Sequence, residues 1–484
     1  MSNILFSHSY YYKLDPKQWK NKMPFPPLGT IYAAALMRNK GHQVHLFDTN
    51  LLDSPKEIET LITNQEFNYL VIYDDGFNYL TKMCLTNMRA ACFEMIQIGK
   101  KHNCCVIVCS SDATDHFEEY LEQGADYIIQ GEGEITLEEL IATLEKENSV
   151  EIIKGIAYKK DQQTQVNPSR TVLQNLDELP LPAWDLINID SYRNIWKQSG
   201  QEFTLNIATT RGCPYKCNWC AKPIYGNRYN AHSPEYIVEE IAYLQENFGV
   251  KRFWICDDIF GLKPNWVQEF NTALQKRNLH IRYFIQSRVD LLLKEDTIDA
   301  LAKSGLEEVW VGAESASQKI LDAMDKGTQV SEIYEATRLL KQKKIKVAFF
   351  LQFGYLTEKQ EDIQKTIQMV KELLPDNIGI SVSYPLPGTK FYNKVKDDLK
   401  LKANWKDSDD LDLMFQGTYS SHYYRKLQRF VHKEYRKSQG LYYLKNIFNS
   451  QIDSDKLKAI LKLVYYIPSA YWDKIQLNTL ENES

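Results

Sequence analysis

The chain has 484 residues, enough for two or three domains, and its apolar fraction of 44% and charged fraction of 25% are those of an ordinary globular protein. A net charge of −5 gives no electrostatic argument for a nucleic acid partner. Nine cysteines and the lack of a secretory leader favour a reducing, cytoplasmic location. The nearest candidate for a membrane span, Ala459 to Trp472, is shorter than the roughly 18 residues required and is interrupted by Lys462 and Pro468. We expect a C-terminal helix packed on the protein instead.

Residues 1–150 alternate short apolar runs with helix-like patterns. Strands separated by helices predict βαβ units and a doubly wound parallel sheet of the Rossmann-like type, an α/β fold. In such a sheet a ligand lies beyond the carboxyl ends of the strands. The five expected strands are Ile4–Phe6, Val44–Phe47, Tyr69–Tyr73, Cys105–Cys109 and Tyr127–Ile129.

Polar and glycine-rich loops follow the third, fourth and fifth of these strands, at the edge where a ligand is expected. Small residues let the backbone approach a ligand closely, although Gly and Ser also join strands where no ligand binds. A dinucleotide is disfavoured because no Gly-x-Gly-x-x-Gly follows the first strand. The candidate residues are Asp74, Asp75, Gly76, Ser110, Ser111, Thr114, Gly131, Glu132 and Gly133.

The alternation resumes in a second domain, residues 201–390, after a connecting region at 151–200 in which Gly155–Tyr158 suggests a short hairpin strand. Six strands with long helical patterns between them predict a partial (βα) barrel, whose active site lies at the carboxyl ends of its strands. Residues 391–484 are mainly helical. The expected barrel strands are Leu205–Ala208, Phe253–Cys256, Ile281–Gln286, Glu308–Gly312, Val347–Phe353 and Ile378–Ser383.

Three cysteines, Cys213, Cys217 and Cys220, directly follow the first barrel strand in a C-x-x-x-C-x-x-C spacing. Soft thiolates select iron–sulfur clusters, Zn or Cu(I) over hard ions. A structural zinc usually takes four ligands in paired knuckles, and no second knuckle follows here. Four cysteines would satisfy every iron of a 4Fe–4S cluster. Three leave one iron open for a substrate or a second cofactor.

The cysteine loop resembles the cluster loop of the radical SAM superfamily, and residues 1–390 resemble the cobalamin-binding radical SAM enzymes. The resemblance implies a 4Fe–4S cluster on the three cysteines, S-adenosylmethionine (SAM) on the open iron, and a cobalamin in the first domain. Motifs at successive strand ends carry it in the expected order. They are Thr209–Gly212, Trp254–Phe260, Gln286–Asp290, Gly312–Ser315, Met324–Thr328, Gly354–Glu358 and Tyr384–Thr389.

The same resemblance implies which residues surround SAM. Arg288 matches a position that can pair with the SAM carboxylate, for which a guanidinium is well shaped. The loop Gly354–Glu358 lacks the second Gly and the Pro that related chains carry in their adenine-contacting loop. A carboxylate at a strand end is also often a helix N-cap, and Arg288 with Asp290 could be a surface pair. The expected SAM residues are Cys256, Asp257, Asp258, Ser287, Arg288, Glu314 and Ser315.

The first domain lacks the Asp-x-His-x-x-Gly motif whose His binds cobalt in many cobalamin domains, so we expect a cobalt without a His ligand. The resemblance places the lower face of the cobalamin against the loop from Asp74 to Tyr79. It places the nucleotide tail past Ser110, Ser111, Thr114 and the Gly131–Glu134 loop.

Other cysteines of the first domain are expected in its core. Cys84 and Cys92 have helical spacing, and Cys105 and Cys109 share one face of a strand. Free Cys is among the most buried residue types. A second cluster is disfavoured because no three cysteines of this domain share a loop.

The reaction implied by the resemblance is methyl transfer to a poorly activated carbon, or to phosphorus, of a small-molecule substrate. An enzyme of the same fold could instead use cobalamin for ring closure or rearrangement. An alternative from another class is a corrinoid- or cluster-binding sensor without turnover. Because the cluster gives an electron to the SAM sulfonium, the resemblance also implies an electron donor such as flavodoxin or ferredoxin.

Overall fold

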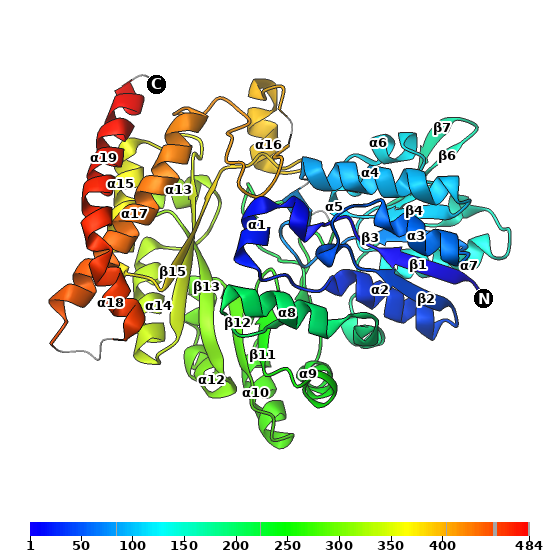
Figure 1. The fold of residues 1–484 in the computed structure, drawn as a ribbon, viewed down its shortest axis with the longest axis horizontal. Helices are drawn as coiled ribbons and strands as arrows, with labels where there is room; N and C mark the ends of the chain where they lie inside the picture. The colour runs from blue at the N-terminus through cyan, green and yellow to red at the C-terminus, as the bar shows by residue number, and fades with distance from the viewer. Residues whose placement is uncertain (84, 223, 403, 449–452, 483–484) are drawn as a thin grey trace. The chain divides into compact units, whose positions relative to one another are not determined.

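The computed structural model describes residues 1–83, 85–222, 224–402, 404–448 and 453–482. They fall into two compact units. Figure 1 shows the helices and strands of the chain, coloured from blue at the N-terminus to red at the C-terminus. The first unit contains Met1–Pro214, Ala221–Ile285 and Asn404–Asp410. The second contains Tyr215–Cys220, Gln286–Ala403 and Leu411–Ser484.

A seven-stranded sheet forms the N-terminal part of the first unit, in the order β2-β1-β3-β4-β5-β6-β7. Pairing is parallel from β2 to β5 and antiparallel at β5–β6 and β6–β7. All five predicted strands form, with bounds within one residue of those expected. The strands are β1 (Asn3–Ser7), β2 (Gln43–Phe47), β3 (Tyr69–Tyr73), β4 (Cys105–Cys109), β5 (Tyr127–Ile129), β6 (Ile156–Lys160) and β7 (Gln163–Val166).

The five strands of residues 1–150 pair in parallel as predicted. The sheet as a whole is mixed because β6, where the sequence suggested a hairpin strand, and β7 form a hairpin that extends it. Their two-residue connection, Asp161–Gln162, has positive φ at both residues (50° and 64°). That backbone suits the right-handed twist of a tight hairpin. The sheet therefore continues through part of the region 151–200 that the sequence pattern reads as a connection.

Helices cover this sheet and the strands that follow it in the first unit. Residues Ile4, Phe6 and Val71 of the strands are completely buried, as are Ala33 of α2 and Leu137 of α7, in one apolar core. Burying each large apolar side chain contributes about 1.5–3 kcal/mol. The helices are α1 (Pro16–Asn21), α2 (Leu28–Asn39), α3 (Glu57–Asn64), α4 (Thr86–Lys101), α5 (Ser111–Asp115), α6 (Phe117–Glu122), α7 (Glu134–Leu144), α8 (Ile189–Ser199), α9 (Pro234–Phe248) and α10 (Trp266–Lys276).

A six-stranded sheet, in the order β15-β14-β13-β12-β11-β8, is the predicted partial barrel. The described pairings are parallel, and the predicted strands match within two residues at each end. A small ladder, β9 (Thr210–Arg211) with β10 (Asn230–Ala231), follows β8. The barrel strands are β8 (Leu205–Ile207), β11 (Arg252–Ile255), β12 (Arg282–Ser287), β13 (Leu306–Glu314), β14 (Lys346–Phe353) and β15 (Asn377–Val382).

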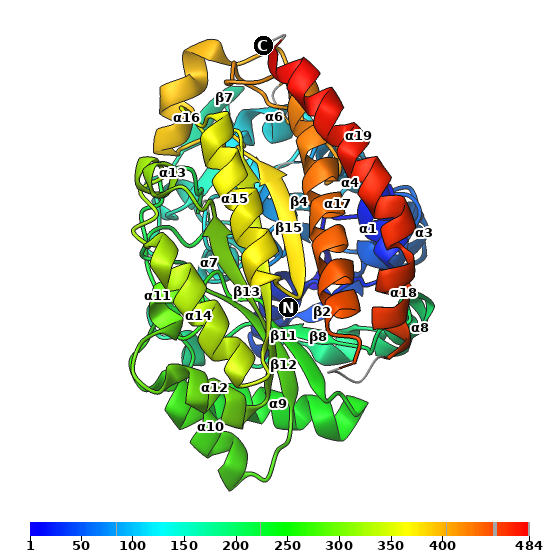
Figure 2. The ribbon, with the colours of Figure 1, turned by 90° about the vertical axis from the view of Figure 1, so that its left-hand side faces the viewer.

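Helices of the second unit follow the barrel strands and then continue as a C-terminal group. In Figure 2, α17 and α19 run side by side, and α17 also packs on α15 and β15. No helix of the described chain combines the length and the apolar character that a membrane span requires. The helices are α11 (Val289–Leu292), α12 (Thr297–Ser304), α13 (Gln318–Ala323), α14 (Val330–Gln342), α15 (Gln360–Leu373), α16 (Lys390–Val395), α17 (Ser421–Lys445), α18 (Ser454–Leu461) and α19 (Leu463–Asn482).

Candidate functional site

Asp257, just after β11, holds the start of the cysteine loop. Its carboxylate accepts hydrogen bonds from the backbone N–H of Thr209 at 2.7 Å and of Thr210 at 3.0 Å, and from the Thr209 hydroxyl. The side chain is buried, and burial raises the pKa of Asp257 to about 7. Gly212 then turns the chain with φ +77°, where an added Cβ would collide with the Arg228 carbonyl. The entry to the loop is therefore fixed by the end of the neighbouring strand.

The three predicted cluster ligands, Cys213, Cys217 and Cys220, are half-buried, and none forms a disulfide. Among the residues that the structure describes, no group of three or more His, Cys, Asp or Glu is placed to hold a single metal ion. A 4Fe–4S cluster binds each thiolate to a different iron, so its cysteines do not converge on one point as the ligands of one ion do. Three accessible soft donors on one loop fit such a cluster.

Arg288 lies against this loop at Cys217. Its guanidinium stacks over the Tyr215 ring at 3.7 Å, and Nη1 lies 4.0 Å from the Cys217 Sγ. The same Nη1 donates to the Lys326 carbonyl at 2.8 Å, and Nε donates to Asp290 at 2.9 Å. The guanidinium therefore places a positive charge close to the Cys217 sulfur. Contact with the SAM carboxylate stays a prediction for Arg288.

Lys326 places a second cation near Cys217. Its ammonium pairs with Glu314 at 2.8 Å, and both side chains are buried. Burial opposes the charge of Lys326, but Glu314 and Cys217 outweigh it and raise the pKa of the ammonium. Gly312 makes room for this pair, since an added Cβ would lie 2.6 Å from the Lys326 Nζ. Glu314 itself has φ +55°, a strained backbone typical of functional sites.

The other residues predicted near SAM are dispersed. The buried Cys256 thiol donates to the Ile207 carbonyl at 3.1 Å, across β8 and β11. The Ser315 hydroxyl is fully buried 3.2 Å from the Thr366 hydroxyl, so it supports local packing. Ser287 is buried at the end of β12, and Asp258 is exposed after β11. Their roles toward SAM stay predictions.

At the carboxyl edge of the N-terminal sheet, both predicted carboxylates hold loops. Asp74 accepts from the Ser9 N–H at 2.6 Å and from the Ser9 hydroxyl at 2.7 Å. Burial raises its pKa to about 6. Asp75 accepts from the N–H groups of Gly29 at 3.2 Å and Phe77 at 3.0 Å. These hydrogen bonds hold the loops at this edge of the sheet and do not identify a ligand.

The second predicted loop is tied to the third. Ser110 caps α5 by accepting from the Ala113 N–H at 2.9 Å, and Ser111 begins that helix. The Thr114 hydroxyl donates to the Ser110 carbonyl at 2.8 Å and accepts from the Gly131 N–H at 3.3 Å. The predicted residues of these two loops therefore lie together.

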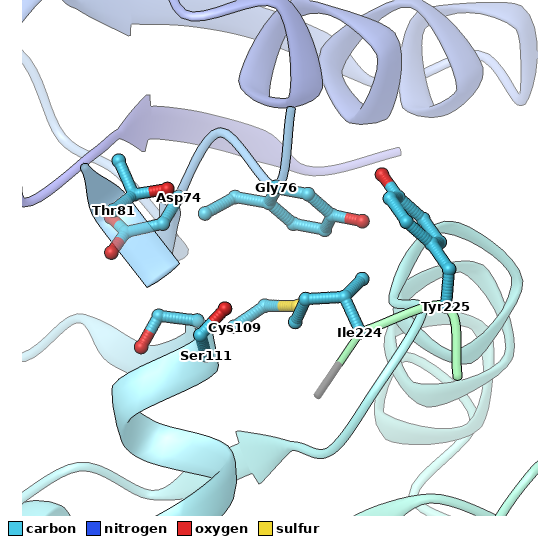
Figure 3. A pocket seen from close by; sticks show the side chains of 9 residues that line it. Asp74, Gly76, Thr81, Cys109, Ser111, Ile224 and Tyr225 are labelled. Atoms are coloured by element: carbon cyan, nitrogen blue, oxygen red, sulfur yellow. The ribbon is translucent and has the colours of Figure 1, made fainter. Parts of the chain in front are cut away.

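A pocket opens between these loops and a segment that follows the cysteine loop (Figure 3). Its free space is only about 10 Å³, room for about one water molecule. An added Cβ on Gly76 would lie 3.2 Å from the Tyr225 hydroxyl, so this ring rests on the glycine backbone. A corrin ring would therefore need Ile224 and Tyr225 to withdraw. The lining residues are Tyr73, Asp74, Gly76, Thr81, Cys109, Ser110, Ser111, Ile224 and Tyr225.

The remaining predicted residues of this edge are Gly131, Glu132 and Gly133. Glu132 belongs to a buried ion cluster that the sequence pattern did not indicate. Arg211 is 2% exposed, and it pairs with Glu132 at 2.6 Å and with Glu134 at 2.8 Å. The guanidinium also lies within 5.6 Å of three ring centroids, those of Tyr32, Phe77 and Tyr225. A basic residue two positions before Cys213 was the only sequence signal.

Gly133, between the two carboxylates, packs closely against the ends of β3 and β4. An added Cβ there would lie 2.5 Å from the Cys109 Sγ and 2.8 Å from the Tyr73 ring.

Among the other cysteines, Cys92 and Cys109 are buried and Cys105 is half-buried, in agreement with their predicted core positions. Cys84 lies outside the described residues.

A second buried acid, Glu240 on α9, was also missed. It accepts from the Trp184 indole N–H at 2.9 Å, and its other oxygen has no hydrogen-bond partner in the described structure. Burial raises the pKa of Glu240 to about 8. The folded protein therefore holds this proton to a higher pH than the unfolded chain does.

Glu240→Gln is expected to stabilise the chain increasingly as the pH rises from about 5 to about 8. The unfolded chain loses its Glu240 proton near its usual pKa of 4.5, whereas the folded chain keeps it until about 8, so the wild type loses stability across this window. The difference in unfolding free energy should grow by on the order of 1 kcal/mol per pH unit. Urea unfolding at several pH values measures it. Glu239→Gln, at the exposed neighbouring position, should show no such trend.

Comparisons with known proteins cover most of the chain. The family model described as the radical SAM superfamily matches residues 207–370, which include the cysteine loop. A protein of Pyrococcus horikoshii, named an uncharacterized methyltransferase, is 28% identical over 80% of this chain and 82% of its own length. An anaerobic magnesium-protoporphyrin IX monomethyl ester cyclase of Synechocystis is 27% identical over 77% of this chain and 73% of its own.

Among solved structures, the cobalamin-dependent S-adenosylmethionine radical enzyme OxsB, with aqua-cobalamin bound, has the same fold. The match has a TM-score of 0.72 and covers 98% of this chain and 72% of that chain, at 17% identity. At this identity the match establishes the architecture: a Rossmann-like sheet, a partial barrel and C-terminal helices.

Proposed function

The chain belongs to the radical SAM superfamily, and we propose that it is a cobalamin-dependent methyltransferase acting on a poorly activated carbon, or on phosphorus, of a small-molecule metabolite. The observation that carries the proposal is the three-cysteine loop, whose entry is fixed at the barrel edge by Asp257. The similarity to a named methyltransferase over 80% of the chain supports methyl transfer.

In this proposal Cys213, Cys217 and Cys220 hold the 4Fe–4S cluster. When bound, the cluster and SAM supply radical chemistry and cobalamin supplies a methyl carrier. The chain's own residues position and insulate these groups. Asp257 orders the loop, while Arg288 and Lys326 place positive charge beside Cys217, which would favour reduction of a bound cluster. An electron donor such as flavodoxin or ferredoxin would supply it.

SAM is proposed to lie along the ends of β11, β12 and β13. Asp258 and Ser287 lie at two of these ends, and Arg288, directly after β12, would exchange one of its protein contacts for the SAM carboxylate. Cys256, Asp257, Glu314 and Ser315 would then support the site through the local contacts described above.

The cobalamin is proposed to lie at the carboxyl edge of the N-terminal sheet, within residues 1–150, and residues 201–390 would form the radical SAM core. Small residues and hydroxyls at this edge suit a close backbone approach, and no Asp-x-His-x-x-Gly supplies a cobalt ligand. Ile224 and Tyr225 would have to move aside, as the small free space of the pocket requires.

The similarity to the Synechocystis cyclase favours a second candidate, a cobalamin-dependent ring closure or rearrangement. Both candidates use the same cofactors, so sequence similarity does not separate them. They differ in the fate of the SAM methyl group.

The chain reconstituted anaerobically with iron, sulfide and hydroxocobalamin is expected to move the labelled methyl group of SAM to the corrinoid under a low-potential reductant. It should also cleave SAM, and Co(II) should give no spectroscopic signal from a protein His nitrogen. SAM cleavage without methyl transfer would favour the cyclase. If neither reaction is observed, the remaining candidate is a corrinoid- or cluster-binding sensor without turnover. Failure to bind any corrinoid would remove the assignment of the first domain.

A further inference from the structure

The charge of the C-terminal helices is opposite to that of the chain as a whole. Residues 421–482 contain eleven Lys and Arg against five Asp and Glu, an excess of six positive charges, whereas the whole chain carries −5. Such an asymmetry indicates a surface that meets a negatively charged partner.

The same region collects the exposed apolar side chains of the molecule. Seventeen large hydrophobic residues are exposed in the described chain, and twelve of them fall between positions 441 and 475. Single exposed apolar residues are ordinary, but a contiguous group marks an interaction surface. The twelve are Leu441, Tyr442, Leu444, Phe448, Leu457, Leu461, Val464, Tyr465, Ile467, Tyr471, Trp472 and Ile475.

Helix α19 has two apolar faces, and only one of them is covered. Leu463, Ala470 and Leu477 are buried at intervals of seven residues, which is the spacing of a face packed along another helix, here α17 (Figure 2). The other face remains open to solvent, with Val464 84% and Tyr471 68% exposed. The sequence expectation of a packed C-terminal helix is therefore met on one face only.

A buried ion cluster fixes the rotation of α19. Asp473 is 2% exposed and pairs with Lys426 at 2.7 Å and Lys433 at 2.6 Å, both on α17. With Asp473 held inward, the residues three and four apart at 464, 467, 471 and 475 share the outward face. The exposed apolar face is thus a fixed feature of the helix pair.

Exposed lysines accompany this face: Lys445, Lys458, Lys462 and Lys474. Their long stems can cover apolar surface while the ammonium groups reach outward. Tyr465, Tyr471 and Trp472 add amphipathic rings, which are typical of the boundary between water and lipid. Apolar, aromatic and basic residues in one helix pair form the pattern of an interfacial membrane anchor.

We propose that α19, with α18 and the end of α17, docks in the plane of an anionic lipid bilayer. The excess of positive charge matches acidic headgroups. It opposes a second copy of the chain, because two such surfaces would bring like charges together. Docking in the plane also agrees with the absence, among the described helices, of one able to span a bilayer. This inference is independent of the proposed catalytic function.

The test is co-sedimentation of the full chain with vesicles of phosphatidylcholine alone or mixed with phosphatidylglycerol. The chain is expected to bind the mixed vesicles more strongly, and less so at 1 M salt, where the screening length falls to about 3 Å. Val464→Asp with Trp472→Glu should lower the affinity at least about tenfold. The matched control is Ile152→Glu with Leu401→Glu, two exposed apolar positions elsewhere, which should leave binding unchanged.

Each contrary result overturns the proposal. These are no binding to either vesicle, equal loss in the test and control variants, or a dimer in light scattering that Trp472→Glu dissolves. In the last case a second copy of the chain covers the face. Circular dichroism of each variant confirms folding, which exposed substitutions should preserve.

Discussion

Replacing any one of Cys213, Cys217 and Cys220 with alanine is expected to abolish SAM cleavage and to remove most of the iron, about four atoms, from the anaerobically reconstituted chain. Each thiolate would hold a different iron, so no other donor on the loop can take its place. The loop itself should remain folded, because Asp257 fixes its entry through backbone hydrogen bonds that do not involve the cysteines. Iron content, the visible spectrum and formation of 5′-deoxyadenosine measure the effect.

Cys105→Ala is the matched control, a half-buried cysteine on β4 that should leave iron content and SAM cleavage unchanged. A functional cluster in the triple variant would show that the ligands lie elsewhere. Stoichiometric zinc without iron would show that the loop is a zinc site.

The strands were predictable because parallel strands buried on both faces read as continuous apolar runs. β3, Tyr69–Tyr73, is buried at every position and was predicted with its true bounds. The hairpin strand β7, Gln163–Val166, was not predicted, because it lies at the sheet edge, three of its four residues are polar and most are exposed. Its tight turn rests on Asp161 and Gln162 with positive φ, and Gln gives no signal for that conformation.

The candidate site was predictable only where its chemistry is local in sequence. The three cysteines lie within eight residues, so their spacing and its resemblance to the radical SAM cluster loop predict a cluster. Asp257 and Arg211 act through partners 48 and 77 residues away, and only the fold brings these together. For Asp74 the sequence pattern predicts the position but not the role, because a carboxylate at a strand end can contact a ligand or hold a loop equally well. The sequence does not distinguish the two.

Arg211→Met is expected to be the most destabilising single change considered for the first unit. The guanidinium is the described counter-charge of two buried carboxylates, Glu132 and Glu134, and removing one partner of a buried pair costs about 3–5 kcal/mol. Urea unfolding of the chain without cofactors measures the loss. Arg38→Met, which breaks an exposed pair with Asp185, should cost no more than about 1 kcal/mol.

A triple variant separates stability from the positioning of the cysteine loop. Combining Arg211→Met with Glu132→Gln and Glu134→Gln removes all three buried charges, and replacing a buried ion cluster with neutral groups is often nearly neutral for stability. We therefore expect the unfolding midpoint to recover while iron incorporation stays low. The reason is that Arg211 lies two residues before Cys213 and ties the loop entry to the Gly131–Glu134 segment. Full recovery of both quantities would show that the ion cluster serves the fold alone.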